Sequence, residues 1–114
     1  FWFVQQLIQM ESSGHSISPG RFDQYMYPYY KKDMEAGTIT REFAQELMDC
    51  IWVKFNDLNK CRDAASAEGF AGYSLFQNLI AGGQNKEGED VTNDLSIMCI
   101  QASMHVHLPA PYFQ

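Results

Sequence analysis

Hydrophobic side chains recur at helical spacing over residues 40–60, the most regular stretch of this chain. They follow steps of four, four, four and three residues, at Phe43, Leu47, Ile51, Phe55 and Leu58. Ala44, Met48 and Trp52 widen this stripe, and polar residues face the other way at Arg41, Gln45, Asp49, Asn56 and Lys60. Thr40 can cap the free amides at the start. The pattern predicts a helix over residues 40–60.

Three other stretches also have helical patterns. Residues 1–11 are apolar over a wide arc, which predicts a helix buried on more than one side. A second helix is expected from about Arg21 to Gly37 after the turn Ser18-Pro19-Gly20, and Pro28 should kink or restart it. A third helix is expected from around Asp90 to about His105, with one apolar stripe at Val91, Leu95, Met98 and Ala102.

Strand signals are short and few. Residues 73–80 alternate in part and end at a Gly-Gly pair, which fits a strand, and Pro109 and Pro111 force an extended path near the end. Residues 61–73 and 82–90 read as loops. Strands between long helices indicate an α/β architecture, mostly helical in this stretch. Because two strands cannot form a stable sheet, further strands are expected from chain outside residues 1–114.

Composition fits a part of a larger core. The 114 residues include two Trp, six Tyr and eight Phe, many large rings for a domain of this length. A domain of this size buries only about two-thirds of its unfolded surface, which leaves little interior for them. The apolar stretches FWFVQQLIQM and LPAPYFQ at the two ends look like cut ends. We therefore expect a fragment of a longer protein.

Charge and cysteine usage exclude several function classes. A formal net charge of −6, with eight scattered Lys and Arg residues, argues against nucleic-acid binding. No run reaches the about 18 apolar residues that a membrane span requires. Cys50, Cys61 and Cys99 form no close-spaced motif. That dispersed, odd count fits a reducing cytoplasm in which each Cys acts as a small hydrophobe.

The richest candidate chemistry lies between Gly14 and Tyr30, GHSISPGRFDQYMYPYY. It places His15 and Ser16 in a tight loop, where the pair could contact a substrate or merely satisfy backbone groups. Arg21 and Asp23 could form a salt bridge that holds the loop. The four tyrosines that follow are expected to be packing rings rather than radical carriers, at Tyr25, Tyr27, Tyr29 and Tyr30.

Two further patterns are weaker. His105 and His107 would point to one side of an extended segment and could bind a metal, but no third ligand clusters nearby in the sequence. Gly82, Gly83 and Gly88 lack the spacing of either phosphate-binding glycine motif. We interpret these glycines as a strand-to-helix turn, and we predict no metal site.

Two segments, GHSISPGRFDQYMYPYY and GGQNKEGEDVTNDLSIMCIQA, resemble the glycyl radical enzymes of the pyruvate formate-lyase superfamily. The nearest branch is that of the B12-independent glycerol and propanediol dehydratases, and the resemblance covers essentially the whole chain. Val91 stands where the family usually has alanine. The ending LPAPYF is similar to the family's LP.P.LS form, but Tyr112 and Phe113 depart from it.

The resemblance implies a ten-stranded α/β barrel, made of two antiparallel half-sheets and ringed by helices. Residues 1–114 would be part of this barrel domain, upstream of a loop with the catalytic cysteine and a loop with the radical glycine. Neither family motif occurs here, and Cys50, Cys61 and Cys99 do not match the Gly-Cys-Val-Glu-like one. The segment would thus hold no catalytic residue and no cofactor, although the parent enzyme would carry a protein glycyl radical.

The resemblance also assigns His15 and Ser16 to substrate binding, because the dehydratases bind substrate hydroxyls with a His–Ser pair in this loop. An imidazole can donate from one nitrogen and accept at the other, and a serine hydroxyl does both. Adjacent hydroxyls of a diol need such mixed partners. His15 could also share a proton with a departing hydroxyl, since the ordinary histidine pKa is about 6.5.

The expected function is therefore that of a diol-type dehydratase, a carbon–oxygen lyase, of which this segment is an inactive part. Alternatives are another glycyl radical enzyme, similar to formate C-acetyltransferase or choline trimethylamine-lyase, or one acting on hydroxyproline or a sulfonate. A stand-alone small acidic helical binding module is the alternative from a different class. The resemblance implies a cytoplasmic homodimer of anaerobic metabolism, activated by a radical-SAM enzyme, with a small-molecule substrate.

Overall fold

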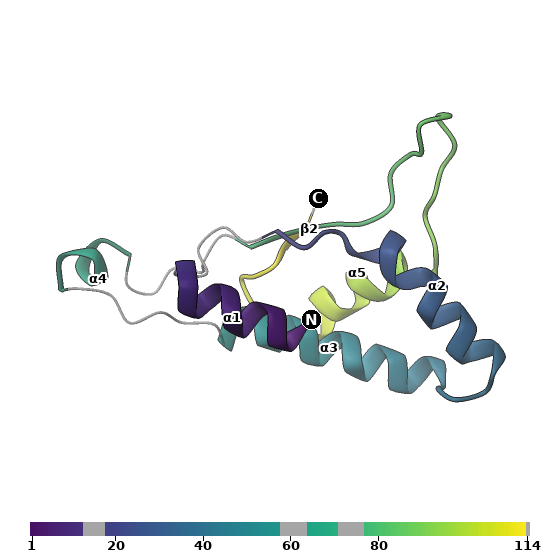
Figure 1. Cartoon of the computed structure of the whole chain (residues 1–114), viewed down its shortest axis with the longest axis horizontal. Helices are drawn as coiled ribbons and strands as arrows, with labels where there is room; N and C mark the ends of the chain where they lie inside the picture. Colours follow the sequence, from purple (N-terminus) through teal and green to yellow (C-terminus); the bar gives the residue numbers. More distant parts are fainter. Residues whose placement is uncertain (13–17, 58–63, 71–76, 114) are drawn as a thin grey trace.

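The computed structural model describes residues 1–12, 18–57, 64–70 and 77–113. Its elements, in chain order, are α1 (Trp2–Ser12), β1 (Gly20–Arg21), α2 (Phe22–Glu35), α3 (Arg41–Asp57), α4 (Ala64–Phe70), β2 (Asn78–Ile80), α5 (Asp94–Val106) and β3 (Tyr112–Phe113). Helices α1, α3 and α5 lie on the same side of the strands (Figure 1). The predicted α/β class, mostly helical in this segment, is confirmed, and the segment forms a small three-stranded sheet of its own.

Helices α3 and α5 build the core. The buried face of α3 carries Met48, Trp52 and Phe55, and α5 meets it with Met98 and Cys99, which are fully buried. Two polar contacts join the same helices: Gln45 Nε2 donates to the Met98 carbonyl over 3.1 Å, and Trp52 Nε1 donates to Ser103 Oγ over 2.7 Å.

The predicted apolar face of α3 is rotated in the structure. Phe43 and Leu47, placed in the core by their spacing, are exposed, whereas Gln45, placed on the polar face, is buried. Burial of Gln45 is possible because its amide donates to Asp49 Oδ1 over 2.9 Å and to α5. These two bonds satisfy the Gln45 NH2 group, whereas the buried Gln45 Oε1 has no hydrogen-bond partner among the described residues.

The sheet is parallel, with strand order β1-β2-β3. Gly20 and Arg21 pair with Leu79 and Ile80, and β2 pairs on its other side with Tyr112 and Phe113. Two strands were expected, so β1 is a correction: Gly20 and Arg21 were interpreted as a turn and a helix start. A two-residue strand is too short to show an alternating pattern.

Asn56 fixes the path of the chain into β3. Its Nδ2 donates to the Ala110 carbonyl over 2.6 Å, and its Oδ1 accepts from the Ala110 N–H over 3.1 Å. One side-chain amide therefore binds both backbone groups of a buried residue. The end of α3 and the approach to β3 are held together in this way.

Three helix predictions need correction. Helix α2 continues through Pro28 instead of restarting there, and Pro28, which has no N–H to donate within the helix, is exposed. Helix α4 lies where a loop was predicted, because alanine-rich AASAEGF favours a helix. Helix α5 begins at Asp94 rather than near Asp90. Asn93 caps it: the Asn93 side chain accepts from the Ser96 N–H, and the Ser96 side chain accepts from the Asn93 N–H.

Helix α1 is exposed along most of its apolar surface. Exposed large apolar residues of the helix are Trp2, Phe3, Val4, Leu7 and Met10, and Phe1, which precedes it, is exposed too. The predicted burial on more than one side is therefore not found among the described residues. The helix is held by edge-on packing of Phe1 against Phe22 and Phe55, with ring centroids 6.0 and 5.3 Å apart.

Candidate functional site

The predicted substrate pair, His15 and Ser16, lies outside the described residues. The structure describes the residues on both sides of this pair: α1 ends at Ser12, and the chain is described again from Ser18. The geometry of the candidate site is therefore that of the described residues around this pair. These form the cavity beside Ser18, the hydrogen bonds of β1, and the turn that follows β2.

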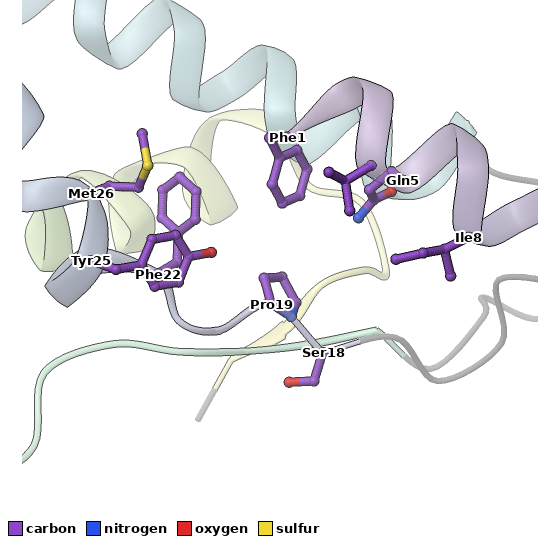
Figure 2. Close-up of a pocket in the computed structure, with 9 residues that line it drawn as sticks. Phe1, Gln5, Ile8, Ser18, Pro19, Phe22, Tyr25 and Met26 are labelled. Atoms are coloured by element: carbon purple, nitrogen blue, oxygen red, sulfur yellow. The ribbon is translucent and has the colours of Figure 1, made fainter.

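A cavity of about 360 Å³ lies between α1 and the start of α2. It is lined mostly by apolar side chains, with three polar ones among them: Phe1, Val4, Gln5, Ile8, Ser18, Pro19, Phe22, Tyr25 and Met26. Figure 2 shows Phe1, Phe22 and Pro19 facing one another across it, with Ser18 at its lower rim. The cavity wall therefore includes the described residues that directly follow the His15–Ser16 loop.

A buried amide pair lies beside this cavity. Gln5 of α1 is 3% exposed and Gln77, next to β2, is fully buried. Gln5 Nε2 donates to Gln77 Oε1 over 3.3 Å. Within the described residues, Gln5 Oε1 and Gln77 Nε2 have no hydrogen-bond partner. The contact ties α1 to the strand region, and it leaves one acceptor and one donor unused.

Arg21 and Asp23 hold the turn after β2. Arg21 donates from Nη2 to the Gly82 carbonyl over 2.9 Å and from Nη1 to the Gln84 carbonyl over 3.3 Å. Asp23 Oδ2 accepts from the Gly82 N–H over 2.6 Å and also from Ser96 Oγ. Instead of the expected salt bridge with each other, Arg21 and Asp23 bind the carbonyl and the N–H of Gly82. Both residues have a structural role, as expected, but they hold the turn after β2 rather than binding each other.

Asp23 is the centre of this network. Its side chain is fully buried and joins the start of α2 to the turn after β2 and to the first turn of α5. Gln24 adds a second link, because its Nε2 donates to the Val91 carbonyl over 2.9 Å. Sequence analysis expected only a salt bridge between Arg21 and Asp23 and missed these partners, which lie more than fifty residues away along the chain.

The glycine-rich stretch is a turn, as predicted. Gly82, Gly83 and Gly88 have φ angles of 69°, 83° and 83°, which favour glycine. Gln84 and Asp90 form an antiparallel bridge. The Asn85 side chain closes the turn by accepting from the N–H groups of Glu87 and Glu89. These backbone amides are used within the turn.

The tyrosines of α2 divide into packed and exposed rings. Tyr27 and Tyr30 pack against the core, half-exposed Tyr25 meets Phe22 edge-on with ring centroids 5.6 Å apart, and Tyr29 is exposed. Burial raises the pKa of Tyr25, and the Cys99 thiol raises it further. Burial is also the main cause that raises the pKa of Tyr30, so both phenols stay protonated at neutral pH.

The two histidines near the end do not form the expected pair. His105 lies in the last turn of α5, and its Nδ1 is 3.0 Å from Asp49 Oδ2. His107 is the C-cap residue, with a φ of 52°. The premise of an extended segment was therefore wrong. Within the described part of the chain, no group of three or more His, Cys, Asp or Glu residues could hold a metal ion.

The cysteines differ in environment. Cys99 is buried, and burial, with a smaller effect of the Asp23 charge, raises the pKa of its thiol to about 12. It is a small core hydrophobe, as predicted. Cys50 is exposed, which contradicts that prediction for this residue. Cys61 lies outside the described residues.

The whole of residues 1–114 matches the family model for pyruvate formate lyase-like proteins. The chain belongs to this family. It is similar over its full length to a solved structure from work on 1,2-propanediol dehydration in Roseburia inulinivorans, with 76% identity and a TM-score of 0.90. A glycerol-bound B12-independent glycerol dehydratase from Clostridium butyricum shares 58% identity over 98% of the chain, with a TM-score of 0.86.

A further relative is the (2S)-3-sulfopropanediol dehydratase of Klebsiella oxytoca, 42% identical over 98% of the chain. The chain spans 14% of the length of each of these three proteins. The expected relation to glycyl radical enzymes, and to dehydratases among them, is confirmed. In the described residues, no helix is long and apolar enough to cross a membrane.

Proposed function

We propose that the chain is a segment of a glycyl radical dehydratase that removes water from a small, uncharged vicinal diol. The observation that carries this proposal is the order of similarity. Identity is 76% to the structure linked to propanediol dehydration and 58% to the glycerol dehydratase, but 42% to the sulfopropanediol dehydratase. A pocket for a sulfonate would need a cationic partner that a neutral diol does not need.

In this proposal His15 and Ser16 bind the hydroxyl groups of the substrate. Each can both donate and accept a hydrogen bond, which suits two adjacent hydroxyls. His15 would also share a proton with the departing hydroxyl. The network of Arg21 and Asp23 supports this assignment, because it fixes the strand that follows the loop to the turn after β2. Binding residues need such rigid support.

The described strands are consistent with part of a ten-stranded barrel. Strands β1 and β3 each pair with β2 alone among the described residues, so both have an edge where a further strand can add. The exposed apolar residues of α1, α3 and α5 also favour a segment of a larger body over a stand-alone binding module. Monomeric proteins rarely expose large contiguous apolar patches.

The reactive residues would come from outside residues 1–114. In the parent enzyme, a glycyl radical would supply the hydrogen-abstracting power through a cysteine thiyl. The residues of this segment would bind and orient the substrate, and the segment itself would bind no cofactor. We further propose a cytoplasmic homodimer, activated by a radical-SAM enzyme, as the working form.

The test uses the full-length enzyme, activated under anaerobic conditions, with the glycyl radical quantified by electron paramagnetic resonance. Propane-1,2-diol, glycerol and 3-sulfopropanediol are offered in parallel, and aldehyde formation is followed. The proposal expects turnover of the two neutral diols and little of the sulfonate. An enzyme with a full radical signal that acts only on the sulfonate, or on none of the three, contradicts it.

A further inference from the structure

Ser18 attaches the chain before β1 to the neighbouring strand. Its hydroxyl donates to the carbonyl of Asn78, the first residue of β2, over 2.8 Å. The two residues are 60 positions apart in the sequence, so the contact joins separate parts of the chain. Figure 2 shows the hydroxyl pointing away from Phe1 and Phe22, the rings that line the cavity above it.

The local sequence explains why a side chain makes this contact. Pro19, between Ser18 and β1, has no N–H and cannot donate to a strand ladder. Strand β1 has only two residues, Gly20 and Arg21, and its pairing with β2 is correspondingly short. The Ser18 hydroxyl thus extends the attachment toward the amino end of β1, past a residue that cannot supply a backbone donor.

Side chains therefore hold β1 at both of its ends. Ser18 binds the start of β2, and Arg21 and Asp23 bind the turn that follows it. Ser18 is the described anchor that lies nearest in sequence to the proposed substrate pair, two residues after Ser16. Backbone geometry keeps Cα atoms two residues apart within about 7 Å of each other.

We propose that Ser18 is a positioning residue for substrate binding, which acts by holding the end of the loop that carries His15 and Ser16. This inference rests on the function proposed above. Ser18 does not contact the substrate; its hydroxyl fixes the chain from which the binding side chains project. Loss of this anchor should weaken binding of the ground state and the transition state alike, which raises KM and leaves kcat nearly unchanged.

The test compares four variants of the full-length activated enzyme with the wild type. Ser18→Ala removes the donor, and Ser18→Thr retains a hydroxyl in a similar place. Thr40→Ala is the matched control, because it deletes a hydroxyl that accepts from the Phe43 N–H at the start of α3. His15→Ala reports on the proposed substrate pair. Steady-state kinetics with propane-1,2-diol, radical yield and thermal stability are measured for each.

The expected result is a KM raised about fivefold in Ser18→Ala, which is the effect of one typical hydrogen bond, with unchanged kcat and radical yield. Ser18→Thr should restore most of the wild-type KM, and Thr40→Ala should change only stability. A wild-type KM in Ser18→Ala, or an equal rise in Thr40→Ala, overturns the positioning role while the function stands. Normal turnover in His15→Ala overturns the substrate-binding role of His15 and with it the positioning role, while the dehydratase function still stands.

Discussion

The N–H of Gly82 donates to the buried carboxylate of Asp23 over 2.6 Å, and this bond joins the start of α2 to the turn after β2. The same carboxylate oxygen accepts from Ser96 Oγ in the first turn of α5. Arg21 binds the carbonyl of the same glycine. Through these bonds the carboxylate of Asp23 connects the start of α2 with the turn after β2 and with α5.

Asp23→Ala should loosen this junction. It leaves the Gly82 N–H buried without its acceptor, which costs about 3 kcal/mol. Amide hydrogen exchange of residues 82–96 in the full-length enzyme should accelerate by about a hundredfold. Asp23→Asn keeps one oxygen acceptor of the same shape and should have a smaller effect. Wild-type exchange rates in the alanine variant would contradict this role.

Asn56 offers a second test of a side chain that replaces a backbone partner. Asn56→Ala removes the acceptor and the donor that Ala110 uses, and should cost about 2 kcal/mol. Asn56→Asp is the matched control: it can still accept from the Ala110 N–H, but its second oxygen faces the Ala110 and Trp52 carbonyls. Both variants should lower the melting temperature. Equal melting temperatures in the wild type and the two variants would rule out a stabilising role for the Asn56–Ala110 contact.

The Cys99 thiol should give a pH dependence of stability with a defined sign. Its pKa is raised from 9.0 to about 12 by burial, so the unfolded chain loses the thiol proton first. The stability that this burial contributes is present below pH 9 and is lost as pH rises toward 12. Cys99→Ala should show a shallower fall in stability over this range. An identical slope in both proteins would be the contrary result.

The outward side of α5 should control self-association of the isolated segment. Ile97, Ile100 and Met104 are exposed, whereas Leu95 and Met98 on the other side are buried. Ile100→Lys should reduce aggregation of the isolated chain, because it removes an exposed apolar side chain, without loss of helix content. Met98→Lys, its control on the buried side, should unfold the α3–α5 pair because it buries an unpaired charge. Circular dichroism and light scattering distinguish the two.

Much of this fold could be predicted from the sequence. Helix α3 was predicted because its apolar residues repeat at helical spacing from Phe43 to Leu58, and the glycines of the turn after β2 have the positive φ angles expected of a turn. Periodicity gave the existence of α3 but not its buried face, since Gln45 is buried through bonds to Asp49 and α5 that no local pattern encodes.

The missed features have a common cause. Strand β1 and the roles of Asp23 and Asn56 depend on partners more than fifty residues away along the chain. The likeness of two motifs to a family, rather than spacing, led to His15 and Ser16. Both residues lie outside the described part of the chain, so their role in substrate binding is a prediction.

The most direct measurement compares His15→Ala and Ser16→Ala with the wild-type full-length enzyme under anaerobic conditions. Glycyl radical yield is determined first, and aldehyde formation from propane-1,2-diol is then normalised to it. Loss of a hydrogen bond to a substrate hydroxyl should lower kcat/KM by at least about tenfold in each variant, at an unchanged radical yield. Wild-type turnover per radical in both variants would contradict the claim that this segment binds the substrate.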